Sequence, residues 1–401
     1  MKEHLSDRIN NMSTSATLAM AAKARELRNS GKDIIGLSLG EPDFNVPDFV
    51  KEAAKQAIDE NYSSYPPVDG YADLKAAITE KFKRDNSLDY SPNQIVVSTG
   101  AKQSIANVAM VMLNKGDEVI LPAPYWVSYR DIVKLAEATP VVVRTSIEHD
   151  FKITPQQLEE AITPKTKMLW FSSPCNPSGS VYSLEELKGL SEVLKKHPGI
   201  FVVSDEIYEH INFQGKHVSI AGIDGMYERT ITVNGVSKAF AMTGWRIGYI
   251  GAASWIARAC TKFQGQITSG ANAIGQRATI AALQAPVSKI SYMIEKFHSR
   301  RDLILKLLGE IDGFKLNIPE GAFYVFPDIS SFFGKTLNGI QIKDASDFAM
   351  YLLEHANVAT VTGTAFGNPD CIRISYAASE EEITEAIKRI RTAVTGIKAM
   401  A

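Results

Sequence analysis

Cysteine is scarce in this chain of 401 residues, and the three that occur, Cys175, Cys260 and Cys371, are scattered and odd in number. This pattern argues against a disulfide framework and favours a reducing, cytoplasmic location. No pair of cysteine or histidine residues has the spacing of a zinc site, and no HExxH motif occurs. We therefore expect no metal centre, and we expect the seven histidines to be structural or solvated.

Long apolar runs and an excess of one charge are also missing. No stretch approaches the ~20 apolar residues of a membrane helix, and the first residues lack the apolar core of a secretory signal. The 43 basic and 45 acidic side chains leave a formal charge of −2. A chain without a basic stripe is a poor partner for nucleic acid or an anionic membrane, so we exclude both. The composition, with 45% hydrophobic and 22% charged residues, is that of a soluble globular enzyme.

Between about residues 50 and 290, short β-rich runs alternate with amphipathic helical patterns such as 102–113 and 184–196. Several runs are continuously apolar, which is typical of strands buried on both faces. Capping signals at Thr154 and Ser183 support two further helix starts. Such alternation predicts an α/β fold with a mostly parallel sheet between helices. The predicted strands are Ile95–Ser98, Glu118–Leu121, Pro140–Arg144, Lys167–Ser172, Ile200–Ser204, Thr230–Val233 and Arg246–Ile250.

After residue 290 the pattern changes to a long charged helix at 290–311, a short apolar segment at 321–326, and a last helix that begins at the capping box of Ser379. A chain of this length is expected to form two domains. We predict a large domain at 48–290 and a smaller α+β domain made of 1–47 and 291–401.

The segment from Asn234 to Gly248 places Lys238 and Arg246 between two predicted buried strands. A lysine amine forms a Schiff base with an aldehyde, and a partly buried cationic site makes it nucleophilic by lowering its pKa. The alternative is a surface-loop lysine, which is the fate of most lysines.

Three other segments supply polar groups at the ends of predicted strands. Asp205 ends one of them, where an ionised carboxylate would keep a pyridine nitrogen protonated; alternatively it caps the next helix. Asn176 follows another strand and, with Tyr208, could donate to the phenolate oxygen of a pyridoxal, although a Pro/Gly-rich turn also explains Asn176. Gly100 leads from a strand into a helix, whose free N–H groups would bind phosphate.

Together these segments resemble the class I aminotransferases of pyridoxal 5′-phosphate (PLP) fold type I over nearly the whole chain, and within them the bacterial aspartate aminotransferase subgroup. The order and spacing of the segments carry the resemblance. They are 13–17 (Ser-Thr-Ser-Ala-Thr), 40–44 (Gly-Glu-Pro-Asp-Phe), 125–129 (Tyr-Trp-Val-Ser-Tyr), 204–209 (Ser-Asp-Glu-Ile-Tyr-Glu), 239–246 (Ala-Phe-Ala-Met-Thr-Gly-Trp-Arg) and 371–376 (Cys-Ile-Arg-Ile-Ser-Tyr).

The resemblance implies a catalytic group of three residues. Lys238 would be the Schiff-base lysine and the general base, Asp205 would pair with the pyridinium nitrogen, and Tyr208 would bind the phenolic oxygen together with Asn176. Trp126 would stack on the cofactor ring. A homodimer with shared active sites is implied as well. The phosphate would be held by Gly100, Ala101, Lys102, Ser237, Arg246 and, from the partner chain, Tyr65.

For the substrate, the resemblance implies that Arg373 grips the α-carboxylate as a fork, with the Gly40 backbone, Trp126 and Asn176 beside it. Animal-type relatives bind the distal carboxylate with a second arginine, and none lies between Arg258 and Arg277 here. The bacterial subgroup instead implies Lys102, Ser15 and Thr17. Alternatively, Lys102 neutralises the cofactor phosphate or points into solvent.

Two positions depart from the family pattern. Many relatives have a phosphate-binding serine where this chain has Gly235, so one phosphate contact is expected to be missing or replaced by water. The usual Asn-Pro-Thr-Gly is here 176–179, with Ser178 in place of threonine.

The expected activity is ping-pong transamination between an amino acid, with aspartate favoured, and a keto acid, with 2-oxoglutarate favoured. The alternatives are an aromatic or broad-specificity aminotransferase, or a PLP-dependent lyase on the same scaffold. A non-catalytic PLP-fold regulator would need a DNA-binding domain, for which we expect no room before Gly40. A nicotinamide dehydrogenase would need a glycine fingerprint that the sequence lacks.

Overall fold

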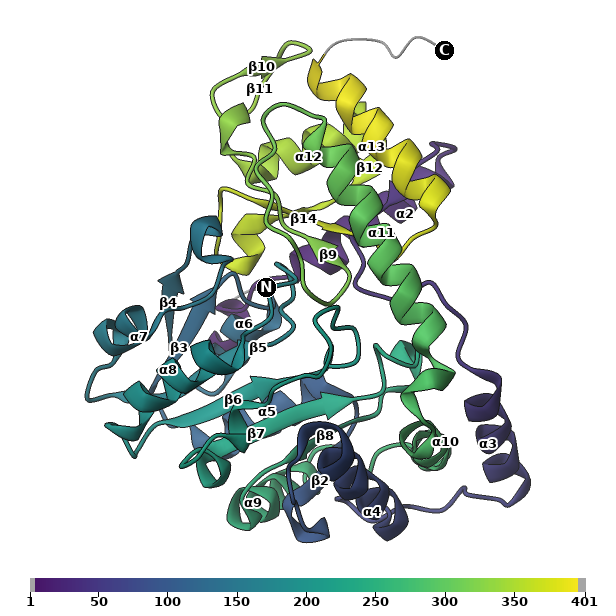
Figure 1. Ribbon diagram of the computed structural model, residues 1–401, viewed down its shortest axis with the longest axis vertical. Helices are drawn as coiled ribbons and strands as arrows, with labels where there is room; N and C mark the ends of the chain where they lie inside the picture. The colour runs from purple at the N-terminus through teal and green to yellow at the C-terminus, as the bar shows by residue number, and fades with distance from the viewer. Residues whose placement is uncertain (1–3, 396–401) are drawn as a thin grey trace.

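The computed structural model describes residues 4–395, and its centre is a seven-stranded sheet in the order β2-β8-β7-β6-β5-β3-β4 (Figure 1). β8 runs antiparallel to both of its neighbours, and every other neighbouring pair in this sheet is parallel. The predicted mostly parallel sheet is therefore confirmed. The strands are β2 (Ile95–Ser98), β3 (Glu118–Ala123), β4 (Thr139–Arg144), β5 (Thr166–Ser172), β6 (Phe201–Asp205), β7 (Thr230–Gly235) and β8 (Gly248–Gly251).

Helices cover both faces of this sheet, because successive strand residues face opposite sides. In β2, for example, Val96 faces one layer of helices, whereas Ile95 and Val97 face the layer on the opposite side. One face is covered by α5 (Ala101–Met112), α6 (Ser128–Leu135) and α9 (Ser254–Gln264). The other is covered by α4 (Ala72–Lys81), α7 (Pro155–Ala161), α8 (Leu184–Lys195) and α10 (Ala273–Gln284), with α3 (Asp48–Asp59) against α10.

A smaller α+β region follows the sheet in the chain. Its core is the antiparallel sheet β13-β14-β9, packed against three helices. In Figure 1, α11 extends from the level of α10 into this region. The elements are α11 (Ser291–Gly309), β9 (Tyr324–Val325), the hairpin β10 (Thr336–Leu337) and β11 (Ile340–Gln341), α12 (Ala345–His355), β12 (Val358–Ala359), β13 (Val361–Thr362), β14 (Ile372–Ser375) and α13 (Glu380–Thr395).

The N-terminal segment joins this smaller region rather than the large sheet. β1 (Ile35–Gly36) pairs in parallel with β12. The helix α2 (Ala16–Asn29) contacts β12 and β13, and Figure 1 shows it, in purple, beside the C-terminal elements. A short helix, α1 (Asp7–Asn10), precedes it. The domain boundaries at 47/48 and 290/291 stay a prediction. Between residues 4 and 395, no helix combines the length and the hydropathy that crossing a membrane requires.

The expected strands and helices are present, with ends shifted by a few residues. The capping boxes expected at Ser183 and Ser379 form, and the helix expected after Thr154 begins at Pro155, where Thr154 and Gln157 also form a capping box. One boundary was wrong: Arg246 was placed at the start of a strand, but it has a left-handed backbone (φ 57°) after a 3₁₀ turn, and β8 begins at Gly248. The apolar run alone could not reveal this turn.

The structure also explains Gly235, where the family pattern suggested a serine. Gly235 is buried at the end of β7, paired with Gly248, and does not line the cavity described below. A Cβ atom there would lie 2.9 Å from the carbonyl oxygen of Ile247 and 3.1 Å from Cδ1 of Ile207.

We expect Gly235→Ser to lower the free energy of unfolding by about 1–3 kcal/mol, because overpacking displaces neighbouring backbone. Urea unfolding followed by circular dichroism measures this change. Gly199→Ser is the matched control, since a Cβ at Gly199 meets no atom within 4 Å. Equal stability of the two variants would contradict the prediction.

Candidate active site

A cavity of about 390 Å³ lies at the carboxyl ends of the central parallel strands, the usual ligand position in α/β sheets. Ser172 and Asp205, which end β5 and β6, line it, and Lys238 enters it from the segment after β7. Most of the predicted site residues meet in its wall. They are Ser15, Thr17, Gly40, Ala101, Lys102, Trp126, Asn176, Asp205, Tyr208, Ser237, Lys238, Arg246 and Arg373.

Two predicted residues lie elsewhere. Gly100 is the N-cap of α5 with φ 81°, and a Cβ atom on it would be 2.5 Å from Nη2 of Arg246. Glycine therefore lets the Arg246 guanidinium approach the helix N-terminus. Tyr65 is 97% exposed and does not contribute to the cavity of its own chain.

Lys238 points into the cavity and donates a hydrogen bond of 2.7 Å from Nζ to the carbonyl oxygen of Gly40. Its ammonium also lies 5.6 Å from the centre of the Tyr208 ring. Burial, and next the repulsion from Arg373, lower the pKa of Lys238 to about 8. An amine with this pKa is partly unprotonated near neutral pH, as a nucleophile or a general base must be.

Asp205 is 5% exposed and is held by two hydrogen bonds. Tyr129 donates to Oδ2 at 2.7 Å, and the Ile207 N–H donates to Oδ1 at 3.3 Å. Burial raises the pKa of Asp205 to about 6, although both hydrogen bonds oppose the increase. No helix begins after Asp205, because a turn follows at 207–210, so it is not the helix cap that we considered.

Arg373 on β14 is a buried cation, only 2% exposed. Its Nη1 donates to Oδ1 of Asn176 at 2.9 Å and its Nη2 donates to the carbonyl oxygen of Ser38 at 2.5 Å, whereas Nε has no hydrogen-bond partner among residues 4–395. Both acceptors are neutral. The guanidinium also lies 4.6 Å from the centre of the Tyr324 ring. Burying a cation without an anion is costly, so this site favours an anionic ligand.

The remaining wall brings together the residues expected near the substrate's distal end. Lys102 lies 5.0 Å from the centre of the Trp126 ring, and burial, followed by Arg246, lowers its pKa. Ser15 makes no side-chain capping bond to α2, and the buried hydroxyl of Thr17 has no hydrogen-bond partner in the described part of the chain.

The charges of the cavity are unbalanced. Its cations are Lys102, Lys238, Arg246 and Arg373, and its carboxylates are Glu41 and Asp205. In the described part of the chain, 4–395, none of the four cations forms an ion pair with a carboxylate. Such an excess attracts and retains anions.

Sequence reasoning missed several contributors. Tyr129 had no assigned role, although it stands three residues after Trp126, and helical spacing could have suggested that both face one site. Tyr324 donates to or accepts from Tyr208 at an O–O distance of 2.7 Å. A Cβ atom on Gly40 would lie 2.2 Å from that Tyr324 hydroxyl. Glu41, which hydrogen-bonds to Thr243, was also missed. Only tertiary contacts reveal these last relations.

The lowered pKa of Lys238 predicts a pH-dependent effect on stability. Between pH ~8 and ~10.5 the unfolded chain binds more protons at this lysine than the folded chain does. The free energy of unfolding of the wild-type protein therefore increases as the pH rises through this window. We expect Lys238→Met to stabilise the ligand-free protein most below pH 8, with the advantage shrinking through this window. Urea unfolding across pH measures it. Lys115→Met, at an exposed lysine, should show no such trend.

Comparisons with known proteins identify the family. The model of the "Aminotransferase class I and II" family matches residues 32–390. The aspartate/prephenate aminotransferase of Cereibacter sphaeroides is 49% identical over 98% of this chain and 99% of that protein. Among solved structures, the aspartate aminotransferase of Rhizobium meliloti superposes with a TM-score of 0.94, at 44% identity and 98% coverage of both chains. The Thermus thermophilus aspartate aminotransferase with maleate gives 0.91, at 41% identity, over 97% of this chain and 99% of that one. The chain belongs to the class I and II aminotransferases.

Proposed function

We propose that this aminotransferase uses PLP to transfer the amino group of aspartate to 2-oxoglutarate. The observation that carries the proposal is the cavity with four cations and two carboxylates, in which none of the cations forms an ion pair with a carboxylate of residues 4–395. PLP carries a phosphate, and both substrates carry two carboxylates. The cavity volume of about 390 Å³ lies in the range of cofactor and ligand pockets.

The residues of the cavity fit PLP. Ala101 and Lys102 belong to the first turn of α5, where backbone N–H groups have no helical acceptor and favour a phosphate. Ser237 and Arg246 add a hydroxyl and a guanidinium on the same wall. Burial raises the pKa of the Asp205 carboxyl group. Its carboxylate would pair with the protonated, cationic ring nitrogen. Asn176 and Tyr208 would face the phenolic oxygen, and Trp126 would cover the ring.

When bound, PLP supplies a ring that withdraws electrons from the α-carbon of the amino acid. Lys238 holds the cofactor and then moves the proton from the substrate's α-carbon, for which its pKa of about 8 is suited. Gly40, whose carbonyl oxygen accepts from Nζ, aims the amine into the cavity.

Arg373 would bind the α-carboxylate common to all amino acids. Asn176 and the Ser38 carbonyl hold its guanidinium in place by hydrogen bonds. A planar guanidinium can offer two parallel N–H donors to a carboxylate, which fixes the orientation of the α-carbon relative to Lys238.

We also propose a cytoplasmic homodimer in which Tyr65 reaches the phosphate of the other subunit. In support, the Tyr65 side chain is 97% exposed, so it is free to reach a neighbouring subunit. The family resemblance implies this role for Tyr65.

Purified protein with PLP should convert aspartate and 2-oxoglutarate to oxaloacetate and glutamate in a coupled assay. We expect Lys238→Ala to lower kcat by about three orders of magnitude or more, because the group that moves the proton is gone. Circular dichroism and thermal unfolding confirm that the variant is folded. Normal turnover by Lys238→Ala would overturn the proposed mechanism.

Lys102 is proposed to bind the distal carboxylate, with Ser15 and Thr17 close by. Lys102→Met keeps an unbranched side chain of similar length and removes the charge, which lies 5.0 Å from the centre of the Trp126 ring. We expect kcat/KM to fall about tenfold or more for aspartate and less than about threefold for phenylalanine, which has no distal charge. Equal losses on both substrates would assign Lys102 to the cofactor phosphate instead.

Prephenate is a second candidate acceptor. The cavity mouth contains Leu18 and Leu39, which are 61% and 43% exposed, and such apolar side chains would suit a ring between two carboxylates. The relative from Cereibacter sphaeroides is named for both substrates. Steady-state assays with prephenate in place of 2-oxoglutarate test this proposal, and the lack of turnover would reject it.

A further inference from the structure

The turn that follows β6 has two faces. Asp205, Ile207 and Tyr208 line the cavity, whereas Glu206 and Glu209 do not line it and are buried. The turn is closed by the hydrogen bond from the Glu209 N–H to the Glu206 carbonyl oxygen at 2.9 Å. Any shift of the two glutamates therefore moves the side chains on the cavity face.

Glu206 is completely buried and fully engaged. Its Oε1 accepts hydrogen bonds from the hydroxyls of Ser204 at 2.8 Å and Ser219 at 2.6 Å. Its Oε2 lies 3.1 Å from Nε2 of His217. Burial by itself lowers the pKa of His217, but the neighbouring Glu206 carboxylate outweighs this effect and the pKa is raised. The His217 imidazole is therefore suited to be the counter-ion of Glu206.

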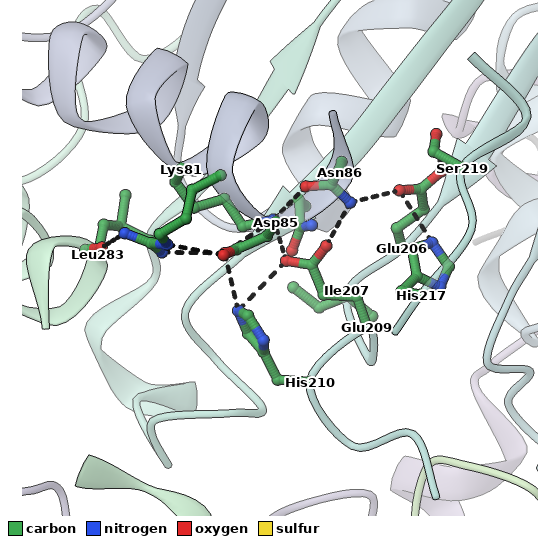
Figure 2. Close-up of polar contacts among 12 residues, drawn as sticks. Lys81, Asp85, Asn86, Glu206, Ile207, Glu209, His210, His217, Ser219 and Leu283 are labelled. Atoms are coloured by element: carbon green, nitrogen blue, oxygen red, sulfur yellow. Dashed lines mark hydrogen bonds and ion pairs between the residues drawn. The ribbon is translucent and has the colours of Figure 1, made fainter. Parts of the chain in front are cut away.

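Glu209 is anchored to a different part of the chain, the end of α4 and the π-helical turn at Phe82–Asn86. It forms an ion pair with Lys81, whose side chain is 1% exposed. Asn86 bridges the network, because its Nδ2 donates to Glu209 at 2.7 Å and lies 3.4 Å from Glu206, and its Oδ1 accepts from Lys81 at 2.6 Å (Figure 2).

The network has its own cation and does not need a metal. Asp85, Glu209 and His210 bring ligand atoms within 4.8 Å of one another, which is close enough for a metal site. However, the Lys81 ammonium already pairs with Glu209, and Arg84 hydrogen-bonds to Asp85. Burial by itself raises the pKa of Glu209. The surrounding Lys81, His210 and His217 outweigh this effect and lower the pKa to about 2.

We propose that Glu206 and Glu209 are positioning residues, which through Lys81, Asn86 and His217 hold the turn that presents Asp205 and Tyr208 to the cavity. Buried polar networks fix the arrangement of the groups around them, and here only Nδ1 of His217 lacks both a hydrogen bond and an ion pair among the five network residues, as far as residues 4–395 are concerned. The ion pair need not stabilise the fold to do so, since buried pairs of this kind often contribute little net stability. The inference rests on the proposed function, in which both cavity residues contact PLP.

The double variant Lys81→Met/Glu209→Leu tests the proposal. It removes both charges together and leaves no unpaired ion, so the protein should stay folded. Absorbance titration of cofactor-free protein with PLP should give a dissociation constant at least about tenfold higher, because a displaced Asp205 makes a weaker charge-assisted bond. The circular dichroism band of bound PLP should shrink as the ring loses its fixed orientation.

Kinetics separate positioning from general damage. We expect kcat to fall about tenfold or more and KM for aspartate to stay within about threefold, because Arg373 lies on β14 and its partners are outside the turn. Tyr351→Phe is the control: it removes a buried hydrogen bond to the Ala393 carbonyl oxygen in the smaller region and should leave PLP affinity within about twofold.

The outcomes are distinct. A folded double variant with wild-type PLP affinity and kcat would overturn the positioning role, whereas wild-type protein that fails to bind PLP would overturn the proposed function itself. If the double variant does not fold, Glu206→Gln decides. Its amide would face donors on His217 and Asn86, so PLP affinity should fall about threefold or more, and unchanged affinity would overturn the proposal.

Discussion

The uncompensated positive charge of the cavity is the constraint on which the rest of the site depends. Lys238 and Arg373 are withdrawn from water, and the groups that contact them, the carbonyl oxygens of Gly40 and Ser38 and the amide oxygen of Asn176, are all neutral. Dipoles reduce the cost of burying a cation but do not remove it. The missing negative charge must come from ligands, and a phosphate together with carboxylates would supply it. An anionic ligand would therefore relieve unfavourable electrostatics in the cavity.

The same charges set the chemistry of individual groups. Burial lowers the pKa of Lys238, and the positive charge of Arg373 lowers it further. The amine can therefore move protons near neutral pH. Asp205 is shifted in the opposite direction by burial, and it is ready to accept a cation. One low-dielectric cavity therefore lowers the pKa of the lysine and raises that of the carboxyl, so that both move toward neutral pH, where acid–base catalysis operates.

Precise placement in this site comes from rigid neighbours behind the wall. Tyr324 packs against Gly40 so closely that no side chain fits there, and it hydrogen-bonds to Tyr208. Tyr129 holds Asp205 from the side of α6. Behind the turn after β6 lies the polar network of Lys81, Asn86, Glu206, Glu209 and His217. Groups that line the cavity are supported by groups that do not, which is what catalysis by positioning requires.

The sequence by itself determined the parallel sheet and most of the site. Buried parallel strands read as continuous apolar runs, and their carboxyl ends meet at one edge, so Asp205, Asn176 and Lys238 could be assigned to one site. Such patterns are local in the chain. The left-handed turn at Arg246, the fit of Gly235 against the Ile247 carbonyl, and the approach of Arg246 to Gly100 were decided only by the tertiary structure. So was the network behind the turn, which joins Lys81 and Asn86 to glutamates more than a hundred residues later. Contacts between distant segments leave no periodic signal, because their geometry is set by how the helices and the sheet pack.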